Sequence, residues 1–273
     1  MKLSIITVNL NNRGGLQKTI DSVVPQTFRD FEWIVIDGGS TDGSKELIEQ
    51  YADHFAYWVS EPDKGIYNAM NKGIKLAKGE YLQFLNSGDW LHDNNVLKDV
   101  FSLEWRADII YCDYEFFTGD QLFTQEFTPE ILKLSYLINH WIGHNASFIK
   151  RILFDNCPYD EKYTIASDWK FFIQQAILGK TFLHHPIIVS CLDNTGISVT
   201  NQEKVIQERH DIITSTIPQC ILYDIEDLNK IIGDQKIMKI KEYKDSCWLY
   251  RKIILTALRI IRFIENIRSR KCK

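Results

Sequence analysis

The chain has 273 residues, of which 45% are hydrophobic, 12% aromatic and 25% charged. This composition excludes a largely disordered chain, and the length suits one α/β catalytic domain with an appendage. The formal net charge of −4 excludes general binding of nucleic acid, because such binding needs a dense positive surface.

The first 110 residues alternate between strands and helices. Each predicted helix carries apolar residues at helical spacing, and the predicted strands are short apolar runs at 3–8, 32–36, 57–60, 80–85 and 108–111. This alternation favours an α/β fold with a mostly parallel central sheet flanked by helices. In such a sheet the loops that leave the carboxyl ends of the strands meet at one edge and bind the ligand.

The second half of the chain is less regular. Residues 129–155 have a helical pattern that becomes strand-like at 144–149, and a helix is expected at 167–178. A strand at 182–192 follows, and the pattern from 203 onward is helical with a break near Pro218.

Acidic side chains follow three of the predicted strands. Asp37 comes directly after the strand at 32–36, Asp63 lies in the loop after 57–60, and Asp89 follows the strand at 80–85. Aspartate also favours turns and helix N-caps, which is the structural alternative for each loop taken alone. Because several successive loops share the feature, we expect the three carboxylates to converge on one cleft.

The same loops carry a family resemblance. The segments SIITVNLN (4–11), VIDGGSTDG (35–43), DKGIYNAMNKG (63–73) and LNSGD (85–89) resemble, in order, the motifs of family 2 glycosyltransferases with a GT-A type fold. HNASF (144–148) and ASDW (166–169) resemble later blocks of that family. The resemblance implies a catalytic domain at 1–202, with a nucleotide-binding part at 1–110 and an acceptor-side part at 111–202, followed by a helical extension at 203–273.

The resemblance also implies an activity. Family members of this type transfer a monosaccharide with inversion from a nucleotide diphosphate sugar, here expected to be UDP-linked, to a glycan or lipid-linked acceptor, and a bacterial surface polysaccharide is the expected product. Two alternatives are a sugar nucleotidyltransferase and a catalytically silent, membrane-associated partner with the same fold. The first lacks support, because the first strand is not followed by a Gly-rich, Arg- and Lys-bearing loop of the kind that activates a triphosphate.

Roles in donor binding follow from the resemblance. Asp37 is expected to accept a hydrogen bond from the uracil or ribose edge, and Gly38 stands where a second acid is usual. The other implied nucleotide-binding residues are Val8, Asn9, Leu10, Gly65, Asn71 and Ser87. Those implied to contact the donor sugar or the acceptor are Asp63, Lys64, Tyr67, His144 and Trp169, although a lone His is often structural and Trp169 is equally suited to a core.

Two carboxylates are expected to carry the chemistry. Asp89 resembles the last acid of the family's DxD-like motif, which binds Mg²⁺ or Mn²⁺, and Gly88 replaces a frequent acid there. Asp168 resembles the acceptor-side acid, which implies that it is the general base. The structural alternatives are an N-cap of a helix at 90–101 for Asp89 and an N-cap of the helix at 169–178 for Asp168.

The end of the chain differs in charge from the rest. From 251 to 273 there are eight Lys or Arg and one acid, interleaved with apolar residues in the segment 248–267. Such a helix suits peripheral contact with an anionic membrane surface, where a lipid-linked acceptor would lie. Packing on the catalytic domain or on a second subunit of a homodimer is the alternative.

The hydrophobic pattern of the sequence predicts no secretory signal and no membrane span. The N-terminal run turns polar too early for a secretory signal, and no run of about 18 apolar residues predicts a membrane span. The six cysteines include no CxxC pair, which indicates free thiols in a reducing compartment. We therefore expect a cytoplasmic protein, with the membrane contact on the inner face.

Overall fold

The computed structural model describes residues 1–104, 106–119, 121–194 and 196–233. Two compact units are found, 1–216 and 217–273, and the described part of the second contains helix α9 (Gln219–Gly233). The expectation for 248–273 concerns residues outside this description. Within the described segments, no helix is long and apolar enough to cross a membrane.

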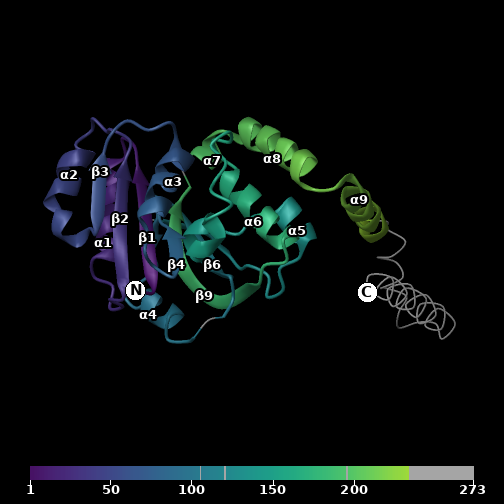
Figure 1. Ribbon diagram of the computed structural model, residues 1–273, viewed down its shortest axis with the longest axis horizontal. Helices are drawn as coiled ribbons and strands as arrows, with labels where there is room; N and C mark the ends of the chain where they lie inside the picture. The colour runs from purple at the N-terminus through teal and green to yellow at the C-terminus, as the bar shows by residue number, and fades with distance from the viewer. Residues whose placement is uncertain (105, 120, 195, 234–273) are drawn as a thin grey trace. The chain divides into compact units, whose positions relative to one another are not determined.

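Four parallel strands form the first half of the sheet. They are β1 (Leu3–Asn9), β2 (Phe31–Asp37), β3 (Tyr57–Ser60) and β4 (Tyr81–Phe84), in the order β3-β2-β1-β4. They lie side by side in the left part of Figure 1. β1 is buried along its whole length, as expected for a parallel strand covered on both faces. The predicted α/β fold with helices flanking the sheet is confirmed.

Helices cover both faces of these strands. Apolar residues of α1 (Arg13–Val23), α2 (Ser44–Gln50) and α4 (Val96–Val100) join one core cluster with Ile5 of β1. A 3-10 turn, η1 (Ala52–His54), follows α2. Helix α3 (Ile66–Leu76) packs on the opposite face, where a Cβ built on Gly73 would lie 2.5 Å from Ile6 Cγ2. Gly73 therefore allows α3 to approach β1 closely.

The second half of the sheet mixes parallel and antiparallel pairs. Its strands are β5 (Trp90–Leu91), β6 (Ile109–Thr118), β7 (Gln121–Glu126), β8 (Ser147–Lys150) and β9 (Phe182–Asp193). The order continues β4-β8-β6-β9-β5, and β7 pairs with β6. β8 runs antiparallel to both of its neighbours, whereas β6 and β9 are parallel.

The segment 129–155 departs from its helical pattern. It contains one short helix, α5 (Leu134–Asn139), two 3-10 turns, η2 (His144–Ala146) and η3 (Arg151–Phe154), and β8 between them. The strand-like pattern predicted at 144–149 is confirmed, since β8 fills the place between β4 and β6. Helix α6 (Ser167–Ile177) follows close to its predicted position.

The first compact unit extends past residue 202, where the helical extension was expected to begin. After α7 (Ile197–Thr200), helix α8 (Gln202–Thr216) packs on α6 and belongs to this unit. The Glu208 carboxylate of α8 accepts hydrogen bonds from the backbone N–H groups of Thr164, Ile165 and Ala166 at 2.9 to 3.0 Å. The α8 helix thus holds the loop that leads into α6.

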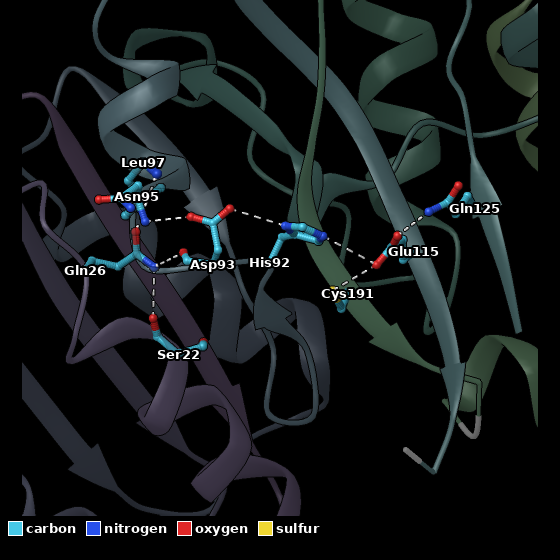
Figure 2. Close-up of polar contacts among 9 residues, drawn as sticks. All are labelled: Ser22, Gln26, His92, Asp93, Asn95, Leu97, Glu115, Gln125 and Cys191. Carbon is cyan, nitrogen blue, oxygen red and sulfur yellow. Dashed lines mark hydrogen bonds and ion pairs between the residues drawn. The ribbon is translucent and has the colours of Figure 1, made fainter. Parts of the chain in front are cut away.

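A polar network anchors the chain just after β5. Figure 2 shows the His92 imidazole between Asp93 and Glu115, and its Nε2 lies 3.7 Å from Glu115 Oε2. Glu115 Oε1 accepts a hydrogen bond from Gln125 of β7, and the backbone oxygen of Asp93 accepts one from Gln26 at 2.6 Å. The segment that follows β5 is therefore tied to the loop after α1 and to β6.

Candidate functional site

The carboxyl ends of β1 and β2 meet through a buried acid. Asp37 is 0% exposed, and its oxygens accept hydrogen bonds from Asn9 Nδ2 (2.7 Å), Ser40 Oγ (2.5 Å) and Ser60 Oγ (2.6 Å). Burial acts to raise the pKa of Asp37, but these hydrogen bonds outweigh it and hold the pKa below its usual value. Asp37 therefore organises three loops, and its contact with a nucleotide stays a prediction.

The loop after β1 connects the neighbouring loops of the same edge. Asn11, which has a left-handed φ of 49°, accepts a hydrogen bond from Thr41 N at 2.8 Å. Asn12 Nδ2 donates to the backbone oxygen of Ser87 at 2.9 Å. The polar loops predicted to share one edge of the sheet are thus in direct contact, and Leu10 projects from them with its side chain 56% exposed.

Asp89 lies at the carboxyl end of β4, and it does not cap a helix. The chain enters β5 directly after it, and the N-cap of α4 is Asn95. Gly88 has a φ of +101°, a conformation that other residues rarely adopt, and a Cβ there would lie 3.2 Å from Asn12 Nδ2. The backbone conformation therefore explains why a glycine stands at position 88.

The surroundings of Asp89 suit a cation. Burial raises the pKa of its carboxyl to about 6, even though the charge of His144 lowers it, so that a carboxylate here needs a positive partner. Two buried amides nearby have unpaired atoms, Oδ1 of Asn86 and both polar atoms of Asn145. Asn145 lies close enough to lower the pKa of Asp89, but its side-chain amide makes no well-formed hydrogen bond.

The residues present fit a cation completed by its ligand. Among the residues described, no group of three or more His, Cys, Asp or Glu side chains could hold a metal ion. Mg²⁺ is often bound through one or two carboxylates together with substrate phosphates and waters. The single carboxylate of Asp89 matches that mode, and it does not match a metal site preformed from protein ligands alone.

Asp168 is held by two side chains from distant segments. Tyr67 of α3 donates its hydroxyl proton toward Asp168 Oδ1 at 2.6 Å, and His144 Nδ1 lies 2.7 Å from Asp168 Oδ2. The N-cap of α6 is Ala166, so Asp168 sits in the first turn and is not the cap. Its side chain is 19% exposed, which leaves the carboxylate accessible to a ligand.

His144 connects the two candidate catalytic acids. Burial acts to lower the pKa of His144, but its hydrogen bond to Asp168 and the charges of Asp168 and Asp89 raise the pKa above its ordinary value. Burial acts to raise the pKa of Asp168, but the contacts with His144 and Tyr67 outweigh it, so the pKa lies below its ordinary value. Asp89, His144 and Asp168 thus form one coupled group of charges.

Some predicted site residues lie elsewhere. Asn71 is buried and exchanges hydrogen bonds with the backbone of Tyr159, so it joins α3 to the segment before α6. Trp169 is 3% exposed and donates to the backbone oxygen of Leu137 at 2.6 Å, while Arg209 stacks on its ring. These contacts are those of core residues, and they leave Trp169 poorly placed to stack on a sugar.

The other predicted residues line the loops of the edge. Val8 and Asn9 are buried at the end of β1, Ser87 and Asp63 are partly exposed, and Lys64 and Gly65 are exposed at the start of α3. Sequence reasoning missed Asn86, Asn145 and Glu208. The two asparagines lie inside the quoted motifs, so their position was the available signal, whereas nothing in the pattern around Glu208 points to the loop at 164–166.

Comparison with known proteins gives a consistent result. The model of the family described as Glycosyl transferase family 2 matches residues 4–170. A PGL/p-HBAD biosynthesis glycosyltransferase of Mycobacterium bovis (strain BCG / Pasteur 1173P2) is 28% identical over 247 residues, which are 86% of this chain and 94% of the relative. An uncharacterized glycosyltransferase of Mycobacterium tuberculosis (strain CDC 1551 / Oshkosh) is 33% identical over 206 residues, 71% of this chain and 76% of the relative.

Solved structures share the fold. S. aureus TarS 1-349 in complex with UDP has a TM-score of 0.62 at 20% identity, covering 84% of this chain and 71% of that one. The mannosyltransferase PcManGT from Pyrobaculum calidifontis, in complex with GDP-Man and Mn²⁺, has a TM-score of 0.62 at 12% identity, covering 95% of this chain and 80% of that one. At these identities the likeness shows the GT-A fold.

Proposed function

This chain belongs to glycosyl transferase family 2, and from this premise we propose its donor, acceptor and mechanism. It transfers a monosaccharide from a nucleotide diphosphate sugar, UDP-linked, to a hydroxyl of a glycan or lipid-linked acceptor, with inversion at the anomeric carbon. The ligands named for the similar structures, UDP for TarS and GDP-Man with Mn²⁺ for PcManGT, support a nucleotide-sugar donor.

The observation that carries the mechanism is the orientation of Asp168 by His144 and Tyr67. A carboxylate has about four lone-pair sites, so the two contacts leave acceptor capacity for a substrate proton. The acceptor oxygen forms a bond to the anomeric carbon, and its proton passes to Asp168. The bond from that carbon to the diphosphate breaks, and the nucleoside diphosphate departs with the electron pair.

Asp89 would hold the divalent cation, Mg²⁺ or Mn²⁺. Such an ion supplies positive charge that offsets the charge developing on the departing diphosphate. On the protein side, the buried Oδ1 atoms of Asn86 and Asn145 have no hydrogen-bond partner, and amide oxygens of this kind suit a hard divalent cation. The charge of protonated His144 favours the ionised form of both Asp89 and Asp168.

The decisive experiment measures transfer and hydrolysis with purified protein and a panel of nucleotide sugars, with and without Mn²⁺. Asp168→Asn is expected to lower kcat about 10² to 10⁴-fold while nucleotide binding persists, and Asp89→Ala is expected to abolish the metal dependence. The anomeric configuration of the product reports inversion. Absence of turnover with every donor, in a wild-type protein that binds nucleotide, would instead favour the catalytically silent partner.

A further inference from the structure

Gly38 marks a space that another residue fills. It follows Asp37 at the end of β2, and a Cβ built on it would lie 2.6 Å from Asp63 Oδ2 and 3.2 Å from Leu10 Cδ1. Both obstacles are the ends of side chains, and Gly38 is not among the glycines with a positive φ. What the glycine provides is therefore room, and the Asp63 carboxylate occupies it.

Asp63 has one oxygen in use and one available. Its Oδ1 accepts a hydrogen bond from Gly65 N at 2.7 Å, which fixes the turn before α3. For Oδ2, the described part of the chain offers no hydrogen-bond partner, and the side chain is partly exposed. By contrast, Asp37 is fully buried with both oxygens occupied. Of these two acids, Asp63 is thus the one that can accept a hydrogen bond from a ligand.

The available oxygen lies beside an apolar surface. The tip of Leu10 approaches the same point above Gly38, and the Leu10 side chain is 56% exposed. An exposed apolar side chain next to a carboxylate oxygen suits a ligand with a flat apolar face and an adjacent N–H or O–H donor. A nucleoside has both, and the loops at the carboxyl ends of the strands are where an α/β sheet binds its ligands.

We propose that Asp63, seated in the space left by Gly38, is the acid that recognises the nucleoside part of the donor through Oδ2. Asp63 lies in the loop after β3. Its carboxylate occupies the position that a side chain of residue 38, in the loop after β2, would otherwise occupy. The inference rests on the proposed function, because it assumes that the ligand of this edge is a nucleotide. It adds a residue that determines nucleoside recognition.

Binding measurements on the full chain with Mn²⁺ and either UDP or GDP test the proposal. Asp63→Asn keeps an acceptor for Gly65 N but replaces Oδ2 by an NH₂ group, so we expect nucleotide affinity to fall about 10- to 100-fold, as for loss of a hydrogen bond to a charged group. Asp53→Asn, the same change at an exposed acid in the turn before β3, is the matched control and should leave affinity unchanged.

A carboxylate swap gives the sharper outcome. Gly38→Asp in the wild type should weaken nucleotide binding, because the new side chain displaces Asp63 and adds a like charge. In an Asp63→Ala background the nearer obstacle, the Asp63 carboxylate, is gone. Gly38→Asp should then raise the affinity at least about tenfold over Asp63→Ala alone, which is 1.4 kcal/mol. Gly38→Ala in that same background fills volume without charge and should give no recovery.

The results separate the inference from its premise. Failure of the wild-type protein to bind either nucleotide would remove the proposed function and this inference together. If the wild type binds nucleotide, two results would overturn the inference alone. One is an unchanged nucleotide affinity in Asp63→Asn. The other is an equal loss of affinity from Gly38→Asp in the wild type and in the Asp63→Ala background. Thermal melting of each variant identifies misfolding. UDP analogues that lack the 2′-hydroxyl, the 3′-hydroxyl or the base N–H identify which group donates the hydrogen bond to Asp63. Only the analogue that lacks this group should bind the wild type and Asp63→Asn equally well.

Discussion

The orientation and the pKa of Asp168, the proposed base, depend most on His144. Its Nδ1 lies 2.7 Å from Asp168 Oδ2, and its hydrogen bond and charge counter the burial that would raise the pKa of Asp168. Because the tautomer of a histidine is assigned from its partners, the contact with a carboxylate places a proton on Nδ1. His144 is thus a positioning residue for the base, with a direct effect on its protonation.

Replacement of His144 should therefore change the pH dependence of the reaction. In His144→Gln the burial of Asp168 is offset less than in the wild type, so the pKa of the base rises and the acidic limb of the kcat profile moves to higher pH. The measurement is the rate of transfer across the acidic range at saturating donor. His184→Gln alters a similar pair, in which Nε2 lies 2.9 Å from Asp113, and should leave the limb in place. An unshifted limb in His144→Gln would contradict the assigned role.

Among the elements, α3 shows how close packing serves the site. The helix carries Tyr67, which donates to Asp168, and it reaches β1 through Gly73. A methyl group there would lie 2.5 Å from Ile6 Cγ2, well inside an ordinary contact distance. The same helix therefore links the apolar interior to the carboxylate of Asp168, the proposed base.

Gly73→Ala should destabilise the protein by about 1–2 kcal/mol, because overpacking outweighs the better helix propensity of alanine. Gly14→Ala is the control in α1, where no heavy atom lies within 4 Å of the added Cβ, and it should be neutral or slightly stabilising. Urea denaturation measures both free energies of unfolding. We also expect Gly73→Ala to lower kcat, since Tyr67 moves with the helix, and equal stability of the two variants would refute the packing argument.

Helix α8 has a comparable role on the other side of Asp168. Glu208 accepts hydrogen bonds from the backbone that precedes α6. Burial acts to raise its pKa, and the bonds from Thr164, Ile165 and Ala166 lower it below the usual 4.5. A group with a depressed folded pKa stabilises above its unfolded pKa, and that stability is lost as the pH falls through the folded value.

Glu208→Gln should accordingly lower the free energy of unfolding by about 1–3 kcal/mol at neutral pH, because backbone donors lose a charged acceptor. The difference from wild type should shrink as the pH falls below 4.5, where the glutamate itself becomes protonated. Denaturation at several pH values checks both the size and the trend. A difference that grows in acid would show that the hydrogen bonds do not carry the effect.

At the scale of the molecule, the basic end of the chain remains a prediction from sequence. Changing Arg251, Lys252, Arg259 and Arg262 to Gln in the full chain should weaken binding to vesicles containing anionic lipid about fivefold per residue, as expected from about 1 kcal/mol per charge near such a surface. Neutral vesicles are the control. Unchanged vesicle binding together with an altered oligomeric state would support the alternative, packing on a second subunit.

The sequence by itself determined the local features of this protein. The alternation of strands and helices, the polar loops at strand ends and the succession of motifs that led to Asp37, Asp89 and Asp168 all depend on periodicity and turn chemistry, which involve residues a few positions apart. The family match over residues 4–170 agrees with that interpretation. Of the segment 129–155, the strand-like part at 144–149 is confirmed by β8, whereas the part before it contains only the short helix α5.

Only the tertiary structure decided which of these residues meet. Tyr67 and Asp168 are 101 positions apart, Glu208 supports a loop on another element, and Asp63 fills the space above Gly38. The same packing buried Asn71 and Trp169, although their motifs suggested a ligand. Contacts of this kind depend on how whole elements pack, and no local pattern specifies the side chain that an element will find on its neighbour.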